Sequence, residues 1–285
     1  MTAPRRITLF TRTRPDPTEA GLERVMELAA EASVEVLIPA EEVEKHGLRT
    51  GAGVVLGADP DAETDLSLVL GGDGTILSSL RRFAGRGVPT FAINYGAIGF
   101  LATVERTELE EGVRRALSGD FDIRPLPTLH AATPNGEDLA VNDISFHRMP
   151  KGRVAELGYT VEGEELGEVR CDGLVISTPA GSTGYNLANG GPVMAWGVEG
   201  YVVSFIAPHT LTARSLVVAP ENVLEVVNRS RYEPVDMTTD GRHVHTVDPG
   251  GKVSIRFEED VAVLAQLPGA TFYERLREKF GRLSY

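Results

Sequence analysis

The sequence predicts an α/β protein with two domains: an N-terminal domain with a parallel sheet and a β-rich C-terminal domain. Three observations lead to this prediction. Over residues 1–122, apolar runs of strand length alternate with segments of helical period. Over residues 123–265, short apolar runs separated by turn residues dominate. Residues 266–285 return to a helical pattern, and we expect this C-terminal segment to pack back on the first domain.

The N-terminal domain is expected to contain four strands joined by helices. The strand-like runs lie at residues 6–10, 34–38, 66–70 and 89–94. Helical spacing of apolar residues predicts helices at residues 17–33, 41–45, 76–83 and 107–117. Strands that alternate with helices predict βαβ units and a parallel sheet covered on both faces.

The C-terminal domain is expected to consist mainly of short strands. They are predicted at residues 139–141, 144–146, 157–161, 174–176, 201–203, 216–218, 223–227 and 253–257. Residues 270–282 read instead as a helix, with Phe272, Leu276 and Phe280 on one face. A β domain of this size has no need of that apolar stripe, so we expect the stripe to be buried on the first domain.

Composition excludes several classes of protein. The chain has 285 residues, of which 42% are hydrophobic, and 28 Lys+Arg against 41 Asp+Glu give a net charge of −13. This balance argues against disorder and against a dedicated nucleic-acid binder, which normally has a basic surface. No run reaches the roughly 20 apolar residues of a membrane helix, so no membrane association is expected. A single cysteine, Cys171, and a polar N-terminus predict a cytoplasmic protein.

The first motif with chemical content is Gly71-Gly72-Asp73-Gly74-Thr75, between a predicted strand and a predicted helix. Glycines let the backbone come close to a ligand, and the start of a helix favours phosphate. The motif matches neither the dinucleotide-binding fingerprint nor the P-loop. Asp73 would repel a phosphate unless it performs chemistry or meets a metal ion. The alternative is a tight turn in which Asp73 caps the helix.

A second motif runs from Asp172 to Tyr185 and is followed by Gly190-Gly191-Pro192. A strand again enters a loop rich in Gly, Ser and Thr, whose hydroxyl and N–H groups can bind a polar ligand. The ring of Tyr185 can cover a base or a ribose. The alternative is a structural loop. A third motif, Asn142-Asp143, is weak alone, because an Asx turn would account for it.

Taken together, these motifs resemble those of the NAD kinase family. The resemblance extends from residue 66 to residue 242 and includes, besides the three motifs above, Asn94-Tyr95-Gly96-Ala97-Ile98-Gly99-Phe100-Leu101, Pro208-His209-Thr210-Leu211-Thr212-Ala213-Arg214 and Asp240-Gly241-Arg242. Motifs found in one order are far more specific than any one of them. The Gly-Gly-Asp-Gly string alone would also fit lipid kinases and phosphofructokinases.

The resemblance implies an enzyme that transfers a phosphoryl group from ATP, or polyphosphate, to the adenosine-ribose 2′-hydroxyl of NAD. It implies that Asp73 is the catalytic base and that a divalent metal ion, Mg²⁺, accompanies ATP. It also implies a homodimer or homotetramer. The implied phosphate-donor contacts are Gly71, Gly72, Gly74 and Thr75. The implied NAD contacts are Asp73, Gly74, Asn142, Asp143, Arg170, Asp172, Ala180, Thr183, Gly184, Tyr185, Ala188, Ala207 and Arg242.

Four of these positions depart from the family pattern. Asp143 stands for the commoner Glu, Ala180 for Thr, Gly184 for Ala and Ala188 for Ser, so the polar lining is thinner. Two alternatives therefore stay open: a catalytically weak NAD(P)-binding regulatory protein on the same fold, and a lipid kinase sharing the glycine loop.

Two further expectations concern residues near these motifs. Arg170 is expected to orient Asp172 or to pair with Asp143, and to favour NAD over NADH, because a carboxylate attracts the positive nicotinamide ring. His243 and His245 alternate along a predicted strand, but without a third ligand nearby we expect no metal site from side chains.

Overall fold

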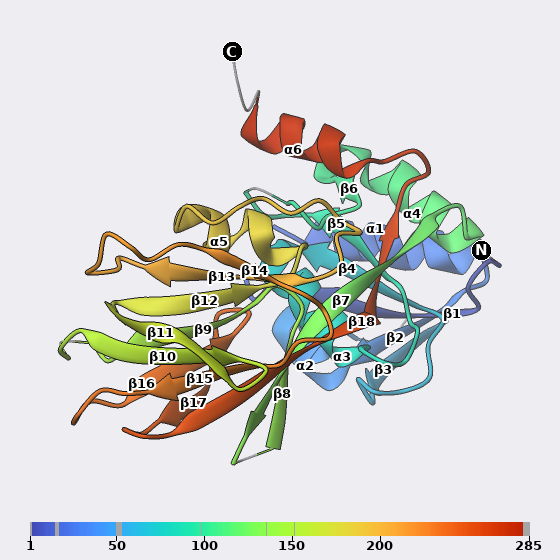
Figure 1. The fold of residues 1–285 in the computed structure, drawn as a ribbon. Helices are drawn as coiled ribbons and strands as arrows, with labels where there is room; N and C mark the ends of the chain where they lie inside the picture. Colours follow the sequence, from blue (N-terminus) through green and yellow to red (C-terminus); the bar gives the residue numbers. More distant parts are fainter. Residues whose placement is uncertain are drawn as a thin grey trace. The chain divides into compact units, whose positions relative to one another are not determined.

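The computed structural model describes residues 2–14, 17–49, 53–97, 99–134, 136–150 and 152–281. Of the segments predicted above, Ile98 and residues 282–285 lie outside this described part. The chain divides into two compact units, Met1–Pro125 with Val261–Tyr285 and Leu126–Asp260. Figure 1 shows the elements of each unit.

The first unit is built on a parallel sheet with the order β3-β2-β1-β4-β5. Its strands are β1 (Arg6–Thr11), β2 (Glu35–Pro39), β3 (Val54–Ala58), β4 (Leu66–Gly71) and β5 (Thr90–Asn94). The short β6 (Val104–Glu105) and the end of β18 (Lys252–Gln266) also pair with β5 in parallel. The sequence did not predict β3, because its residues are half exposed and carry no strong apolar signal.

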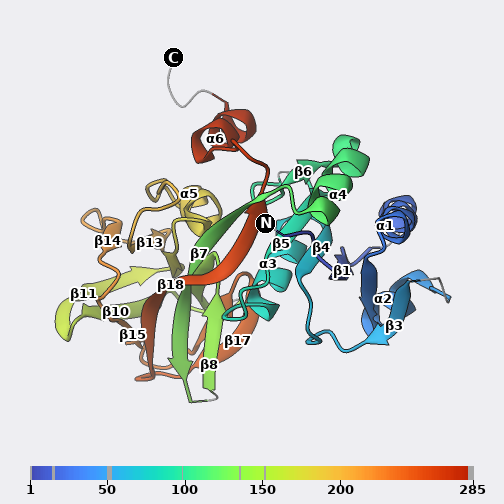
Figure 2. The ribbon, with the colours of Figure 1, turned by 90° about the vertical axis from the view of Figure 1, so that its right-hand side faces the viewer.

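Helices cover both faces of this sheet, as predicted. The helices are α1 (Glu19–Glu31), α2 (Ala40–His46), α3 (Asp73–Arg82) and α4 (Leu109–Ser118), with a 3₁₀ turn, η1 (Arg106–Glu108), before α4. One face joins α1 and α4 to the sheet through a buried cluster that includes Ile7, Leu9, Val25 and Val113. Helix α3 packs on the opposite face (Figure 2), where Phe83 meets Phe10 with ring centroids 6.2 Å apart.

The second unit is almost entirely antiparallel β structure. One sheet has the order β14-β13-β12-β9-β16-β17. Its strands are β9 (Asp143–Arg148), β12 (Gly173–Ser177), β13 (Tyr201–Ile206), β14 (Leu216–Val218), β16 (Val235–Thr239) and β17 (Arg242–Val247). A second layer contains β7 (Asp122–Thr133), β8 (Gly136–Ala140), β10 (Ala155–Val161), β11 (Glu164–Cys171), β15 (Leu224–Asn228) and the start of β18.

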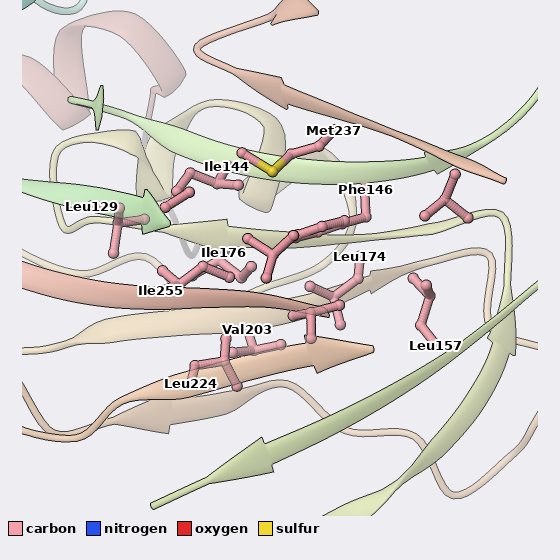
Figure 3. Close-up of a cluster of buried hydrophobic side chains, with 14 of the residues drawn as sticks. Leu129, Ile144, Phe146, Leu157, Leu174, Ile176, Val203, Leu224, Met237 and Ile255 are labelled. Atoms are coloured by element: carbon pink, nitrogen blue, oxygen red, sulfur yellow. The ribbon is translucent and has the colours of Figure 1, made fainter. Parts of the chain in front are cut away.

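Side chains from the two layers meet in one apolar core (Figure 3). Ile144, Phe146 and Ile176 contribute from the six-stranded sheet, and Leu157 and Leu224 contribute from the other layer. All five are fully buried. Burial of one such side chain is worth about 1.5–3 kcal/mol, so this core holds the loops at the strand ends in place. The helical turns η2 (Gly181–Thr183) and α5 (Tyr185–Ala188) follow β12.

The C-terminal helix α6 (Phe272–Phe280) belongs to the first unit, as predicted. It begins at Thr271, whose hydroxyl accepts a hydrogen bond from the Glu274 amide. Phe272 and Leu276 are buried, and the Phe272 ring lies 6.0 Å from that of Phe100. Phe280 is more exposed than expected, at 38%, although its ring also lies 6.0 Å from Phe100.

None of the helices in the described residues combines the length and the hydrophobicity that crossing a membrane requires.

We predict that α6 contributes strongly to the stability of the chain through its buried face. Phe272→Ala should lower the free energy of unfolding by about 3–5 kcal/mol, because it removes a buried ring that contacts Phe100. Tyr273→Ala, at a position that is 69% exposed, is the matched control and should cost much less. Chemical denaturation measures both.

Deletion of residues 270–285 should lower the melting temperature sharply, and an unchanged melting temperature would contradict this placement.

Candidate functional site

In the first unit, the glycine-rich loop joins β4 to α3. Gly71 ends β4, Gly72 precedes the helix and Asp73 is its first residue. The loop lies tightly against the turn after β5: a Cβ atom on Gly96 would stand 2.8 Å from the Gly72 Cα, and one on Gly72 would stand 3.1 Å from the Gly96 Cα. Only glycine permits two backbones to approach this closely without a shift. The sequence therefore uses Gly72 and Gly96 to bring two loops together.

The Asp73 carboxylate binds the backbone of the turn after β5. Its two oxygens accept hydrogen bonds from the amides of Phe100, at 3.1 Å, and Leu101, at 3.0 Å. The residue that caps α3 is Gly72, so the alternative in which Asp73 caps the helix is wrong. The carboxylate is half buried and held at both oxygens. Each oxygen keeps further lone pairs with which to accept a ligand's hydrogen.

Two hollows adjoin this loop. One, of about 360 Å³, is lined by Arg12, Thr13, Arg14, Gly72, Gly74, Thr75 and Gly96. The other, of about 270 Å³, is lined by Phe10, Thr11, Thr13, Glu41, Glu42, Lys45, Gly74, Thr75, Ser78, Ser79 and Arg82. Gly74 and Thr75 line both. Hydroxyl groups, guanidinium groups and backbone amides at a helix start suit an anionic ligand.

Sequence reasoning missed the side chains that β1 and α2 bring to these hollows. Arg12 follows β1 and donates to the Tyr95 carbonyl at 2.8 Å. Lys45 of α2 donates to Glu42 at 2.7 Å, and the Thr11 hydroxyl donates to Glu42 at 2.6 Å. Burial lowers the pKa of the neighbouring His46, against the charge of Glu42. No motif marks these residues, because they come from different elements and only the fold gathers them.

In the second unit, the loop after β12 packs on the Asn142 backbone. Thr178 donates from its hydroxyl to the Val141 carbonyl at 2.7 Å and accepts from the Gly181 amide at 3.1 Å. A Cβ atom on Gly181 would overlap the Asn142 carbonyl oxygen, so this position also requires glycine. The buried Ser182 hydroxyl donates to the Pro179 carbonyl at 2.8 Å. Several hydroxyls of this motif therefore hold the loop itself, which is the structural role considered above.

Asp240 organises the Asn142-Asp143 segment. Its carboxylate accepts hydrogen bonds from the amides of Val141, Asn142 and Asp143, at 3.1, 2.7 and 3.1 Å. The turn is therefore organised by Asp240 rather than by an Asx turn of Asn142. Sequence reasoning found the Asp240-Gly241-Arg242 motif but did not single out Asp240. The signal that could have indicated its acceptor role is an acidic residue in the turn directly after a strand.

Asp143 is a buried carboxyl with an unusual titration. It is 7% exposed at the start of β9. Burial, together with the negative charge of Asp240, raises the pKa of Asp143 to about 7. Next to it, the buried Oδ1 of Asn142 has no hydrogen-bond partner among the described residues. The Asn142 oxygen is suited to accept a hydrogen bond from a polar ligand. The Asp143 carboxyl is suited to share its proton with an acceptor on that ligand.

The Tyr185 ring stacks on His147, with centroids 5.7 Å apart and planes 12° from parallel. Tyr185 is 36% exposed, so part of its ring stays open to a ligand. Burial lowers the pKa of His147 and so favours the neutral imidazole, although the negative charge of Asp236 opposes this shift. This stacking partner was not expected from the sequence.

The expected pairing of Arg170 is wrong. Asp172 lies at the corner between β11 and β12 and pairs with Arg148, with 2.7 Å from Nε to Oδ1. Arg170 pairs instead with Glu156 at 3.2 Å, and its side chain is 66% exposed. The pairing was inferred from two residues sharing a strand face, but the chain has left the strand at Asp172.

The remaining predicted contacts lie at the ends of elements in the second unit. Ala180 is buried just before η2. Gly184 directly precedes the short α5, and Ala188 is its last residue. Ala207 follows β13 with a positive φ of 44°, a strained value for a residue other than glycine. Arg242 begins β17 and is exposed. His243 bonds to Asp236 and Thr246, and no group of three or more potential metal ligands occurs in the part of the chain described.

Comparison with known proteins gives a consistent result over both units. A family model described as the ATP-NAD kinase N-terminal domain matches residues 22–121, and one described as the ATP-NAD kinase C-terminal domain matches residues 141–266. The NAD kinase of Gemmatimonas aurantiaca is 37% identical over 229 residues, 78% of each chain. That of Leifsonia xyli is 35% identical, with 98% of this chain and 95% of its own covered.

Two solved structures are also similar. The NAD kinase from Archaeoglobus fulgidus in complex with ATP has a TM-score of 0.74 and 27% identity, with 97% of each chain covered. Yeast NADH kinase complexed with NADH has a TM-score of 0.87 over 99% of this chain and 89% of its own. Its 20% identity makes it a likeness of fold alone.

The raised pKa of Asp143 predicts a pH-dependent cost in stability. Between the ordinary value of 3.8 and about 7, the folded chain keeps a proton that the unfolded chain has lost, so stability falls as the pH rises through this window. Asp143→Asn removes this loss. Relative to wild type, its free energy of unfolding should rise by about 2–3 kcal/mol between pH 5 and pH 8. Guanidinium chloride titrations at both pH values measure it, with the exposed Asp248→Asn as control. A constant difference would contradict the assigned cause.

Proposed function

Because the chain belongs to the NAD kinase family, we propose residue roles for its reaction, with Asp73 as the catalytic base. The reaction is the transfer of a phosphoryl group from ATP to the adenosine-ribose 2′-hydroxyl of NAD, which gives NADP. The observation that carries the proposal is the Asp73 carboxylate, held by two backbone amides beside hollows lined with anion-binding groups.

In the proposed step, Asp73 accepts the proton of the 2′-hydroxyl while the 2′-oxygen of the ribose attacks the terminal phosphorus of the donor. The new P–O bond forms to the ribose, and the bond to the bridging oxygen of the donor breaks. A hydroxyl is a poor nucleophile until a base lies within hydrogen-bond reach. Two amide contacts fix where the carboxylate stands, and such fixation supplies much of the rate in phosphoryl transfer.

The donor phosphates are proposed to bind at Gly71, Gly72, Gly74 and Thr75. The side chains around the adjoining hollow support this, because Arg12 and Arg14 line it with the glycine loop. Polyphosphate has the same chemistry at its terminus, so the same groups would receive it. Parallel assays with ATP and with polyphosphate separate the two donors.

A divalent metal ion, Mg²⁺, is proposed to accompany ATP. Mg²⁺ is usually held by one or two carboxylates together with substrate phosphates rather than by a protein cage. The donor's phosphates would hold the ion, and no side chain is assigned to it; the described residues include no cluster of three or more potential metal ligands. The metal offsets the negative charge that Asp73 brings to the phosphates.

NAD is proposed to contact thirteen residues, most of them in the second unit. Support comes from the Asn142-Asp143 turn, whose amide oxygen has no partner in the part of the chain that the structure describes, and from the partly exposed Tyr185 ring. The proposed contacts are Asp73, Gly74, Asn142, Asp143, Arg170, Asp172, Ala180, Thr183, Gly184, Tyr185, Ala188, Ala207 and Arg242.

Family membership disfavours the lipid-kinase alternative, and an assay tests the catalytically weak regulatory protein. Purified protein is incubated with NAD, ATP and Mg²⁺, and NADP formation is followed. Binding of NAD without NADP formation would favour the regulatory alternative.

A homodimer or homotetramer in the cytoplasm is also proposed. The edge strand β14, where Val217 is 53% exposed, is consistent with self-association, which light scattering measures.

The first prediction from these roles concerns the base. Asp73→Asn should lower kcat by about 10²–10⁴-fold, or about 3–5 kcal/mol of barrier, because the amide cannot take the proton. Binding of both nucleotides should survive, since a charge facing phosphates is removed. Steady-state kinetics and nucleotide titration measure the two effects. A variant that keeps more than about a third of wild-type turnover, against the roughly hundredfold or larger loss expected of a missing base, would contradict the assignment.

The second prediction concerns the redox form of the substrate. NAD should be preferred to NADH, because the Asp172 carboxylate attracts the positive nicotinamide ring, and Asp172→Asn should relax this preference. Arg170→Gly should leave the preference unchanged, because Arg170 pairs with Glu156 and not with Asp172. The ratio of kcat/KM for NAD to that for NADH is measured in all three proteins. Equal ratios in wild type and Asp172→Asn would exclude a role for Asp172.

A further inference from the structure

The peptide group between Phe100 and Leu101 is engaged at both of its ends. Its N–H, on Leu101, donates to Asp73 Oδ1 at 3.0 Å. Its carbonyl oxygen, on Phe100, accepts a hydrogen bond from Arg275 Nη1 at 2.6 Å. The same Nη1 donates to the Ala102 carbonyl at 2.6 Å. The guanidinium of Arg275 on α6 and the carboxylate of Asp73 therefore bind opposite edges of one peptide group.

Arg275 is itself well fixed. Its Nη2 donates to the side chain of Gln266 at the end of β18. Phe272, three residues earlier on α6, packs its ring on Phe100. Burial lowers the pKa of Arg275. Among the neighbouring negative charges that oppose this shift, that of Asp73 has the largest effect. The guanidinium is therefore a partly buried cation that interacts with Asp73 across the intervening backbone.

From this geometry we infer that Arg275 is a positioning residue for Asp73, acting through the backbone of residues 100–102. The inference rests on the proposed role of Asp73 as the base. A cation on an amide carbonyl polarises the amide and strengthens the hydrogen bond that its N–H donates. Arg275 thus holds the turn in place and also tightens the grip of the Leu101 amide on the carboxylate. It contacts no reacting atom.

A planar fork is needed for this role. One nitrogen of the guanidinium reaches two carbonyl oxygens while the other reaches Gln266. A lysine ammonium is a single point of charge on a flexible stem, so it cannot reproduce all three contacts with the same geometry. Substitution by Lys should therefore keep the charge and lose part of the positioning.

The test compares Arg275→Met with Arg277→Met on the same helix. Arg277 is exposed, so its substitution removes an equal charge from α6 without touching the turn. Arg275→Met should lower kcat by about 10- to 100-fold, the cost of a misplaced catalytic group, with KM for NAD and ATP changed much less. Arg275→Lys should lie between wild type and Arg275→Met, and Arg277→Met should match wild type. Added guanidinium ion at millimolar concentration should partly restore Arg275→Met and leave Arg277→Met unchanged.

The double variant Asp73→Asn, Arg275→Met separates this inference from the role of Asp73. If Arg275 acts through Asp73, adding Arg275→Met to Asp73→Asn should cost little more in kcat. An equal loss in both backgrounds, or a loss of melting temperature and affinity without any effect on kcat, would overturn the inference. If Arg275→Met does not fold, wild-type kcat in Arg275→Lys would overturn it instead. Full activity of Asp73→Asn alone would refute the base, independently of Arg275.

Discussion

The hold of two backbone amides on one carboxylate is the interaction on which the first unit's site depends. Asp73 stands at the first position of α3, where a side chain would ordinarily face solvent or cap the helix. Instead its two oxygens accept hydrogen bonds from the amides of Phe100 and Leu101. This contact is possible only because Gly72 and Gly96 let the two loops approach at van der Waals distance. The close approach at Gly72 and Gly96 and the hydrogen bonds of Asp73 therefore depend on each other.

The second unit uses a carboxylate in the same way. Asp240 accepts three successive amides, from Val141 to Asp143, and so shapes the turn that enters β9. The consequence there is electrostatic as well as geometric, because Asp240 brings a negative charge close to the buried Asp143. In both units a loop without regular secondary structure is stabilised by an acidic side chain that satisfies its donors. Buried amides left without acceptors would cost about 1–3 kcal/mol each.

The reaction of the family asks for opposing properties in a small space. With Asp73 as the proposed base, a carboxylate stays close to phosphates that repel it, and backbone donors and cations reduce that repulsion. The described residues around the glycine loop supply these groups from several elements: Arg12 after β1, Lys45 on α2 and Arg275 on α6. None of these three belongs to a motif that the sequence singles out. Their common property is that each donates to a backbone carbonyl: Arg12 to Tyr95, Lys45 to Thr11 and Arg275 to Phe100.

The sequence by itself determined the fold class, most strands and helices, the return of α6 to the first unit and the family. Apolar periodicity and glycine-rich turns are local properties, so they can be read directly from neighbouring residues. It missed β3, because that strand is half exposed and lacks an apolar signal. It also paired Arg170 wrongly, because strand alternation no longer applies once the chain turns at Asp172.

Only the tertiary structure decided which groups hold the functional side chains. The Phe100 amide lies 27 residues from Asp73, the Asn142 amide 98 residues from Asp240, and the Arg275 guanidinium 175 residues from the Phe100 carbonyl. A hydrogen bond depends on a separation of about 3 Å and on direction, and neither is encoded by spacing along a chain. The sequence therefore specified the acid that we propose as the base, and the packing of sheet and helices specified where that acid lies.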